Sequence, residues 1–302
     1  MKLTELAPAK LNLTLEVGEK RSDGYHEVQS VMSCAALYDE VTLESGTSGG
    51  ISMTCDCPGL PLDDKNLCLR AAKLFVQKTG IPCDGLHIEL SKRIPMQSGL
   101  GGGSADGAAV LAALNHLTQI GLSLEQLEQI AVGCGADIPF CLRGGTQRAQ
   151  GIGEDFSPLS PMPDCPILII KPRFGISTKD AFARSDSTAF SHAQVQRMCQ
   201  ALDTGSVLPI ADCLQNVFEQ LCSADEQKLL HQARQLLIQN GALGALLSGS
   251  GSALFGLFDN EAAACAARSA LQDHPLLEGV FLCRPLPFGA FEAVRNSLRN
   301  PS

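Results

Sequence analysis

Apolar and polar residues alternate near the beginning of the chain and again farther along it. The alternation covers residues 2–17 and 39–54, and residues 85–94 (GLHIELSKRI) follow the same pattern. A period of two residues is typical of β-strands with one buried face. The pattern therefore predicts three strands in the first third of the chain.

Other stretches repeat their apolar residues at helical spacing. The segment DKNLCLRAAKLFVQKTG predicts a helix that ends at Gly80, and a second helix follows a glycine-rich stretch, with Val110 and Leu114 on one face. Ser123 with Gln126 three residues later is a capping-box pattern, which predicts a helix over 123–135. The first half of the chain thus mixes strands and helices.

The segment SPLSPMPDCP (157–166) is dense in proline and serine, which indicates a crossing between domains. After it we expect a strand (ILIIKP), a helical region over about 192–240, a strand (ALFGLF), a helix over 260–272 and a last strand (GVFLCRPL). This order predicts a two-layer α+β domain. The sequence therefore predicts domains at 1–156 and 157–302.

Composition narrows the class of protein. The chain has 302 residues, of which 45% are hydrophobic and 18% charged, as in an ordinary globular enzyme. Its formal net charge of −9 argues against a nucleic-acid partner, although a local basic patch could hold a small anion. The N-terminus lacks the apolar block of a signal peptide, and no run reaches membrane-spanning length. We expect a cytoplasmic protein without a membrane partner, either a monomer or a weak homodimer.

The thirteen cysteines are scattered and odd in number. In a reducing compartment such residues behave as small buried hydrophobes. Cys55 and Cys57 could form half of a metal site, but no second pair with ligand spacing follows, so no protein metal site is predicted. Burial is expected above all for the cysteines in apolar surroundings, namely Cys34, Cys134, Cys141, Cys213, Cys222, Cys265 and Cys283.

The stretch RIPMQSGLGGGSADGAAVLAALNHL (93–117) places many glycines at the start of a predicted helix. It is not a P-loop, because Gly103 is followed by Ser104 with no lysine between them. A dinucleotide fingerprint is disfavoured, since its third glycine and the later acidic residue are missing. Two interpretations stay open on the residues alone: the loop's amides wrap a triphosphate at the helix N-terminus, or the glycines only permit a tight turn against a neighbouring helix.

Three stretches resemble the motifs of the GHMP kinases, in order and position. PMQSGLGGGSADGAA resembles the central motif of that family, PAKLNLTL (8–15) the first, and LSGSGSALFGLF (247–258) the C-terminal glycine motif. Four further segments, KRSDGYHEVQS, DKNL, GCGADIPFCLRGGTQRAQGIGE and LQNVFE, are similar to one branch of the family. That branch phosphorylates the 2-hydroxyl of a cytidine diphosphate-linked methylerythritol in the non-mevalonate isoprenoid pathway.

The resemblance covers residues 8–258 and implies an α+β, two-domain GHMP kinase fold. Its N-terminal domain would be a ribosomal-protein-S5-like α/β unit and its C-terminal domain ferredoxin-like, in agreement with the crossing expected at 157–166. The resemblance also implies ATP as phosphoryl donor, accompanied by Mg²⁺, which bridges phosphate oxygens.

Lys10 and Asp137 are the residues to which the resemblance assigns catalysis. From the pattern alone, Lys10 is typical of a surface lysine whose stem lies along a strand, and Asp137 of a residue that caps the segment starting at Ile138. By resemblance, Asp137 is the base or hydroxyl-orienting group, and Lys10 pairs with it and lowers the pKa of the carboxylate and of the nucleophile.

The resemblance assigns nucleotide binding to the glycine loop and to Asn66 and Lys92, the last two on the adenine side. The loop departs from the family pattern at three positions, where Gln97, Ser98 and Ala105 replace smaller residues or a serine. Ser104 has the hydroxyl best placed to approach the phosphates or the metal. The loop residues concerned are Pro95, Met96, Gln97, Ser98, Gly99, Leu100, Gly101, Gly102, Gly103, Ser104 and Ala105.

For the acceptor, Tyr25 and His26 in the DGYH segment would supply one stacking ring and one hydrogen-bonding ring for a pyrimidine. The resemblance adds Phe182 as a second stacking face. It also assigns Asn12 and Thr178 to the erythritol or phosphate portion. Gly249 and Ser250 complete the predicted substrate site. Packing roles remain open for the two aromatic residues, since aromatic side chains usually pack in cores.

Two other functions are compatible with the same motifs. One is a sensor with this fold that binds nucleotide or sugar without turnover, which has no need of a Lys10–Asp137 pair. The other is a kinase of the family that acts on homoserine or a mevalonate. Those small acceptors have no base to stack, so Tyr25 and His26 favour the cytidylyl acceptor.

Overall fold

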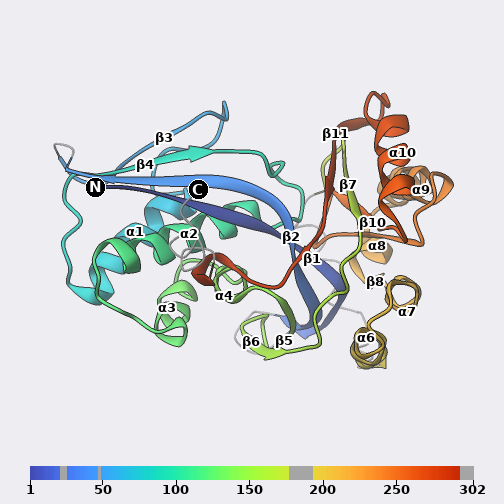
Figure 1. The fold of residues 1–302 in the computed structure, drawn as a ribbon, viewed down its shortest axis with the longest axis horizontal. Helices are drawn as coiled ribbons and strands as arrows, with labels where there is room; N and C mark the ends of the chain where they lie inside the picture. The colour runs from blue at the N-terminus through green and yellow to red at the C-terminus, as the bar shows by residue number, and fades with distance from the viewer. Residues whose placement is uncertain (21–25, 47–48, 177–192, 293–302) are drawn as a thin grey trace.

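The computed structural model describes residues 1–20, 26–46, 49–176 and 193–292 (Figure 1). Two long antiparallel strands, β1 (Lys2–Lys20) and β2 (His26–Ser45), form the centre of the first sheet. Its main strand order is β3-β4-β2-β1-β8. The remaining strands of this sheet are β3 (Ser52–Cys55), β4 (Leu86–Ser91), β5 (Thr146–Gln150), β6 (Asp155–Pro158), β8 (Gln215–Asn216) and β12 (Pro285–Leu286).

The predicted strand over 39–54 is interrupted in the structure. β2 begins at His26 and ends at Ser45, and β3 starts only at Ser52. The first part of β2 was not predicted. Residues 29–35 are buried on both faces of the strand, so apolar and polar residues do not alternate there.

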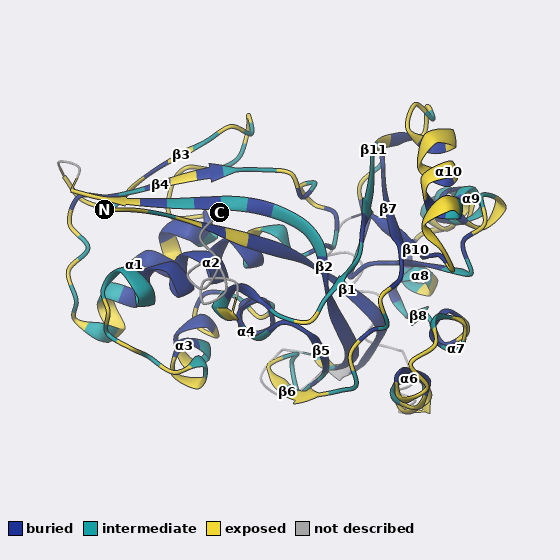
Figure 2. Ribbon diagram, in the orientation of Figure 1, coloured by how far each residue is buried: buried dark blue, intermediate teal, exposed yellow. Residues whose placement is uncertain are grey.

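Helices cover one face of the first sheet (Figure 1). Gly80 ends the first helix in the left-handed conformation, and both bonds of the Ser123–Gln126 capping box are present, as predicted. The second helix is the central one, and most of its Ala, Val and Leu side chains are buried (Figure 2). The helices are α1 (Leu67–Thr79), α2 (Gly102–Leu117), α3 (Leu124–Ala131) and α4 (Ile138–Arg143).

A four-stranded antiparallel sheet forms the second half of the molecule, with the order β11-β7-β10-β9. Helices α9 and α10 pack on one face of this sheet, which confirms the predicted two-layer α+β arrangement of this half. The other face packs against β1 and β2, where Leu11 and Leu13 meet Ile169 and Phe255. The elements are β7 (Ile167–Pro172), α6 (Ala193–Asp203), α7 (Val207–Asp212), α8 (Phe218–Leu221), α9 (Ala224–Gln239), β9 (Gly244–Leu247), β10 (Leu254–Leu257), α10 (Glu261–Leu271) and β11 (Leu277–Cys283).

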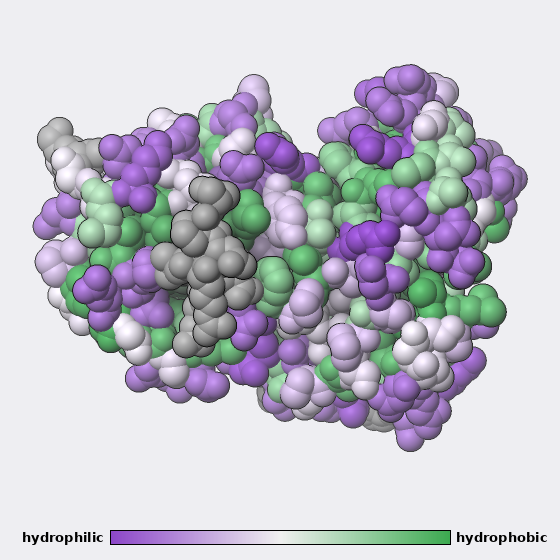
Figure 3. Space-filling view, viewed as in Figure 1, coloured by the Kyte–Doolittle hydropathy of each residue, from purple (hydrophilic) through white to green (hydrophobic). Residues whose placement is uncertain are grey.

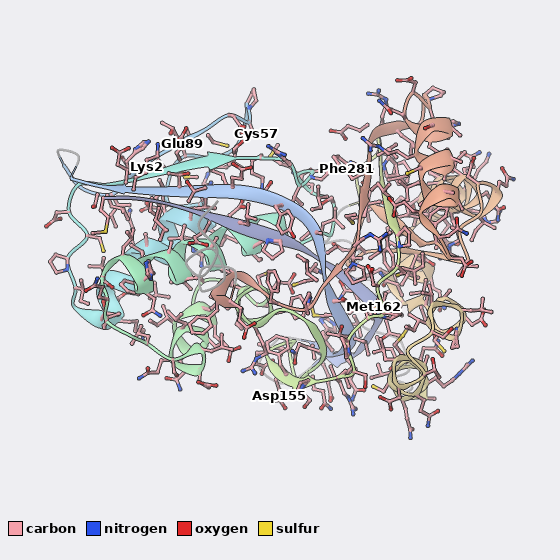
Figure 4. All side chains as sticks on the ribbon, in the orientation of Figure 1. Lys2, Cys57, Glu89, Asp155, Met162 and Phe281 are labelled. Atoms are coloured by element: carbon pink, nitrogen blue, oxygen red, sulfur yellow. The ribbon has the colours of Figure 1, made fainter. Side chains whose placement is uncertain are left out.

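The chain crosses between the two halves more than once. The predicted connection contains Met162, which is buried between the halves and labelled in Figure 4. After β11 the chain returns, because β12 pairs with β2 and Ala290 joins the core under the first sheet. The boundary at 156/157 therefore remains a prediction, and the structure adds that the last described residues belong with the first sheet.

All thirteen cysteines are free thiols, and six of the seven expected to be buried are buried. The expectation for Cys265 is wrong: it lies exposed on α10, where the helix turns its polar side to solvent. On the face shown in Figure 3, hydrophilic residues line much of the outline and break up the hydrophobic areas. Within the described segments, every helix is too short or too polar to cross a bilayer.

Candidate active site

A cleft of about 1040 Å³ lies where the two halves meet. Strand β1 forms one wall of the cleft. The glycine loop and the start of α2 form another wall, and the segments before α1 and α4 form the rim. A turn between β9 and β10 closes the cleft from the second half. The lining residues used below are Lys10, Asn12, Ser30, Asn66, Lys92, Gln97, Gly99, Gly101, Gly102, Ser104, Asp106, Asp137, Gly249 and Ser250.

Lys10 and Asp137 face each other in this cleft. Lys10 is only 5% exposed, and its Nζ lies 3.5 Å from Asp137 Oδ2. The same Nζ donates a hydrogen bond of 2.7 Å to Asn12 Oδ1, and Asn12 Nδ2 donates to Ser30 Oγ at 2.8 Å. Since Lys10 and Asn12 are two residues apart on β1, both side chains leave the same face of the strand. The ammonium is thus held in place by a buried polar chain.

Asp137 occupies the position before α4 but makes no capping hydrogen bond with its side chain. That side chain is 41% exposed and opens into the cleft. The capping role left open by the sequence is therefore not the one seen, and the carboxylate is available to a ligand. Asp137 can accept a proton or a hydrogen bond from an alcohol beside the Lys10 ammonium.

The glycine loop leads directly into α2, which begins at Gly102. Gly99 and Gly101 have φ of +77° and +70°, and Gly101 caps the helix without a side chain. The amides of the first helical turn have no intrahelical partner, and Gly102 and Ser104 line the cleft there. Unpaired amides and the helix dipole together favour an anion at this end of α2.

The glycines also permit close packing against the second half. A Cβ on Gly99 would lie 2.0 Å from the Ser248 carbonyl oxygen, and one on Gly101 would lie 2.7 Å from Cγ of Lys10. Ser248 Oγ donates to the Gly99 carbonyl at 3.0 Å, and the amide of Ala253 donates to the Ser98 carbonyl at 3.0 Å. The close packing that one interpretation expects is thus present, whereas triphosphate binding by the loop's amides stays a prediction. The loop packs against a turn and a strand rather than a helix.

A buried charged cluster lies below the loop. The Lys92 ammonium contacts Asp39 and, at 2.8 Å, Asp106. Asp39 Oδ1 also accepts the amides of Arg93 and Ile94, at 2.5 and 2.8 Å. These bonds tie the chain just before the glycine loop to β2 and α2.

The cluster carries perturbed pKa values. Burial raises the pKa of Asp106 to about 8, against the opposing effect of Lys92. Burial acts to lower the pKa of Lys92, but the charges of Asp106 and Asp39 outweigh it and raise that pKa. Asp106 Oδ1 has no hydrogen-bond partner in the described part of the chain, and the residue lines the cleft. This oxygen is therefore a buried acceptor that the described residues leave unpaired.

The two residues predicted for the adenine side both line the cleft but also have structural partners. Asn66 Oδ1 accepts the amide of Cys68 at 2.9 Å and so caps α1, while its Nδ2 donates to the Pro61 carbonyl at 2.8 Å. Lys92 is held by its two carboxylates. A nucleotide contact by either residue remains a prediction.

The three departures from the family pattern are accommodated locally. Gln97 adopts a positive φ of +51° and lines the cleft. Ser98 Oγ donates to the Pro95 carbonyl at 2.6 Å, within the loop itself. Ala105 is buried in α2. The loop therefore keeps its path with these residues.

Only some of the residues predicted to bind the acceptor lie in the described part of the structure. His26 begins β2, outside the residues that line the cleft. Tyr25, Thr178 and Phe182 lie outside the described residues. Asn12 lines the cleft and bonds to Lys10, as stated above. The acceptor-binding roles of all five residues stay predictions.

Four residues of the site were missed by sequence reasoning. Asp39 and Asp106 form the cluster around Lys92, Ser30 holds Asn12, and Asn216 binds the turn that contains Gly249. Asp106 and Asn216 stand inside motifs that had been singled out, so their buried position was the missing information. Ser30 likewise ends the segment KRSDGYHEVQS, so that only Asp39 stands outside the motifs.

Comparison with known proteins agrees with this geometry. The model of the GHMP kinases N terminal domain matches residues 66–145, and that of the GHMP kinases C terminal domain matches residues 198–275. A 4-diphosphocytidyl-2-C-methyl-D-erythritol kinase of Pelotomaculum thermopropionicum is 41% identical over 258 residues, 85% of this chain and 89% of the relative. The chain belongs to the GHMP kinase family.

Other relatives cover more of the molecule. The kinase of the same name from Lachnoclostridium phytofermentans is 38% identical, over 92% of this chain and 95% of its own. A crystal structure of a 4-(cytidine 5'-diphospho)-2C-methyl-D-erythritol kinase superposes with a TM-score of 0.76 at 32% identity, over 94% of this chain and 99% of that one. A homoserine kinase from Cytophaga hutchinsonii has a TM-score of 0.74 at 22% identity, over 96% of both chains, which shows the shared fold.

The two-domain GHMP kinase fold expected from the sequence is therefore confirmed. As a GHMP kinase the chain is a phosphotransferase that uses ATP. The match to the N-terminal family model includes both the glycine loop and Asp137.

Proposed function

We propose that this chain transfers the γ-phosphoryl group of ATP to the 2-hydroxyl of 4-diphosphocytidyl-2-C-methyl-D-erythritol. The observation that carries the proposal is the position of the Lys10–Asp137 pair in one cleft with the amides at the start of α2. The names of the relatives at 34–41% identity supply the acceptor.

In this mechanism the triphosphate lies against the glycine loop and the first turn of α2. The amides and the helix dipole neutralise part of its charge without reorganisation at the moment of transfer. The acceptor hydroxyl lies beside Asp137, which orients it and accepts its proton. Lys10 stabilises the carboxylate and the charge on the transferred group. Positioning of this kind accounts for most catalysis of phosphoryl transfer.

Mg²⁺ would enter with ATP as part of the substrate. In the described segments no three acidic, His or Cys side chains form a cation site, so phosphate oxygens would supply most of its ligands. Ser104 lines the cleft in the first turn of α2, and its hydroxyl fits one protein ligand. The ion would neutralise phosphate charge there.

The acceptor specificity rests on Tyr25, His26 and Phe182, which we propose hold the cytosine, and on Thr178, Asn12, Gly249 and Ser250 for the remainder. Asn66 and Lys92 would contact the adenine side. Replacing Tyr25 by alanine should weaken binding of the cytidylyl acceptor at least tenfold and change the Kd of ATP less than twofold. Equal effects on both ligands would overturn the stacking role.

A homoserine or mevalonate kinase would need the same cleft but no base pocket, and a sensor would need no Lys10–Asp137 pair. An ADP-release assay with ATP and Mg²⁺ separates these functions. Turnover is expected with 4-diphosphocytidyl-2-C-methyl-D-erythritol and at least a hundredfold less with homoserine or mevalonate. Preference for a small acceptor would overturn the substrate assignment. ATP binding without turnover of any of the three would favour the sensor.

We also propose a cytoplasmic location and a monomer or weak homodimer, without nucleic-acid or membrane partners. The thirteen free thiols fit a reducing compartment, and the net charge of −9 disfavours polyanions.

A further inference from the structure

Asn216 is a buried residue on β8 whose side chain holds two backbone carbonyls of the second half. It is 2% exposed. Its Nδ2 donates to the carbonyls of Leu247 and Gly249, at 2.8 and 2.7 Å. Its Oδ1 accepts the amide of Phe218 at 3.0 Å. Both donor hydrogens and the acceptor of the amide group are therefore in use.

The turn that Asn216 holds touches the catalytic cleft from the other side. A Cβ on Gly249 would lie 2.9 Å from the Gly99 carbonyl oxygen and 3.1 Å from Nζ of Lys10. Ser248, one residue earlier, donates its hydroxyl to the same Gly99 carbonyl. The turn thus bonds to the phosphate-binding loop and lies so close to the ammonium of the catalytic pair that a side chain on Gly249 would touch it.

The strand that carries Asn216 is itself attached to β1. β8 pairs in parallel with β1, and Asn216 lies opposite Leu15, five residues after Lys10. Glu219 adds a second bond, since its Oε1 accepts the amide of Leu247 at 3.0 Å. The segment 216–219 consequently joins the strand of Lys10 to the turn that contacts its ammonium.

We propose that Asn216 is a positioning residue for phosphoryl transfer. It acts through the carbonyls of Leu247 and Gly249 and thereby sets how closely the turn approaches Lys10 and Gly99. Because a peptide unit is planar and trans, holding the Gly249 carbonyl also sets the direction of the Ser250 amide, and Ser250 lines the cleft. The inference rests on the proposed function for the place of the γ-phosphate, but not on the identity of the acceptor.

Asn216→Asp is the sharpest test, because it preserves the side-chain volume and the bond from Phe218 while turning a double donor into an acceptor. A carboxylate oxygen would then face two carbonyl oxygens and repel them. The matched control is Asn115→Asp. Asn115 also bonds a backbone carbonyl and amide, those of Leu122, but lies near the far end of α2 and outside the cleft. Thermal unfolding of both variants measures their structural cost.

For Asn216→Asp we expect kcat to fall at least tenfold, with the acceptor that the wild type turns over best. We expect the Kd of ATP to rise fivefold or more and that of ADP less than twofold, because only ATP carries the phosphate next to Lys10. Asn115→Asp should keep the wild-type kcat and the wild-type ratio of the two Kd values. The Kd ratio requires no acceptor, so an error in the proposed substrate leaves this readout intact.

The proposal is overturned if Asn216→Asp leaves both kcat and the ATP-to-ADP ratio unchanged while it lowers the melting temperature as the control does. It is also overturned if ATP and ADP lose affinity equally. Should Asn216→Asp not fold, Asn216→Ser retains one donor, and an intermediate loss of the same two quantities is expected. An unchanged ratio and kcat in folded Asn216→Ser would contradict the proposal.

Discussion

The hydroxyl of Ser248 donates a hydrogen bond of 3.0 Å to the carbonyl of Gly99, 149 residues earlier in the chain. This bond joins the glycine loop of the first half to the turn between β9 and β10 in the second half. The loop is thus held in its path by contacts from both halves.

Replacing Ser248 by alanine should loosen the loop without removing any group expected to touch ATP. The KM for ATP is expected to rise several-fold, and the free energy of unfolding to fall by about 1 kcal/mol, because the Gly99 carbonyl loses its donor. Steady-state kinetics and urea unfolding measure the two quantities. Thr118→Ala, which removes a 2.7 Å bond to the Leu114 carbonyl at the other end of α2, should change only stability. An unaltered KM in Ser248→Ala would contradict the role given to the contact.

Gly99 should not tolerate a side chain. Alanine there would place Cβ 2.0 Å from the Ser248 carbonyl oxygen at a φ of +77°, so that the loop and the turn must separate. We expect ATP affinity to fall at least tenfold, as measured by calorimetry. Gly121→Ala is the matched control, since Gly121 has a φ of +73° and no neighbour within 4 Å of an added Cβ. It should lose roughly 1 kcal/mol of stability through backbone strain and keep its ATP affinity.

Asp137→Asn should abolish most turnover while leaving the nucleotide site intact. The amide cannot accept the hydroxyl proton, and it no longer pairs with the Lys10 charge. We expect kcat to fall by two orders of magnitude or more with the Kd of ATP changed less than threefold. Asp273→Asn, at an exposed position after α10, is the control for the loss of one negative charge. Near-normal turnover in Asp137→Asn would remove Asp137 from the mechanism.

Glu5 should make the stability depend on pH. It is 2% exposed on β1, its Oε1 lacks a partner among the described residues, and burial raises its pKa from 4.5 to about 7. The native state thus retains this proton up to about pH 7, while the unfolded chain releases it near pH 4.5. The stabilising effect of the neutral form is complete below pH 4.5 and is lost as the pH rises through 7.

Glu5→Gln removes this titration. Between pH 5 and pH 8, the free energy of unfolding of the wild type should fall relative to that of the variant, by up to about 3 kcal/mol. Chemical denaturation at both pH values gives the difference. In Glu44→Gln, at an exposed position on β2, the free energy of unfolding should change with pH as it does in the wild type. If the free energy of unfolding changed equally with pH in the wild type and in Glu5→Gln, Glu5 would ionise normally.

Local signals were sufficient for the elements around the site. The capping box at Ser123 and the glycine stop at Gly80 depend on neighbouring residues only, and both are present. In the second half the hydrophobic pattern predicted β7, β10, α10 and β11, but it missed β9 and the short strand β8. The family motifs led to Lys10, Asp137 and the glycine loop, which the structure brings into one cleft.

Long-range contacts had no such signal. Asp39 lies 53 residues before Lys92, and nothing in the alternation of β2 indicates that its carboxylate will hold the chain ahead of the glycine loop. The return of β12 to β2 depends on tertiary packing that a strand pattern does not specify. Asn216 looked like an ordinary residue of the LQNVFE segment until its three bonds placed it behind the turn.

The most direct test of the account is a crystal structure with a non-hydrolysable ATP analogue and the cytidylyl acceptor. The account predicts the triphosphate against the amides of the glycine loop and the first turn of α2. It also predicts the acceptor 2-hydroxyl within hydrogen-bond distance of Asp137, with Nζ of Lys10 beside it. A triphosphate bound elsewhere, or an acceptor hydroxyl remote from Asp137, would contradict the account.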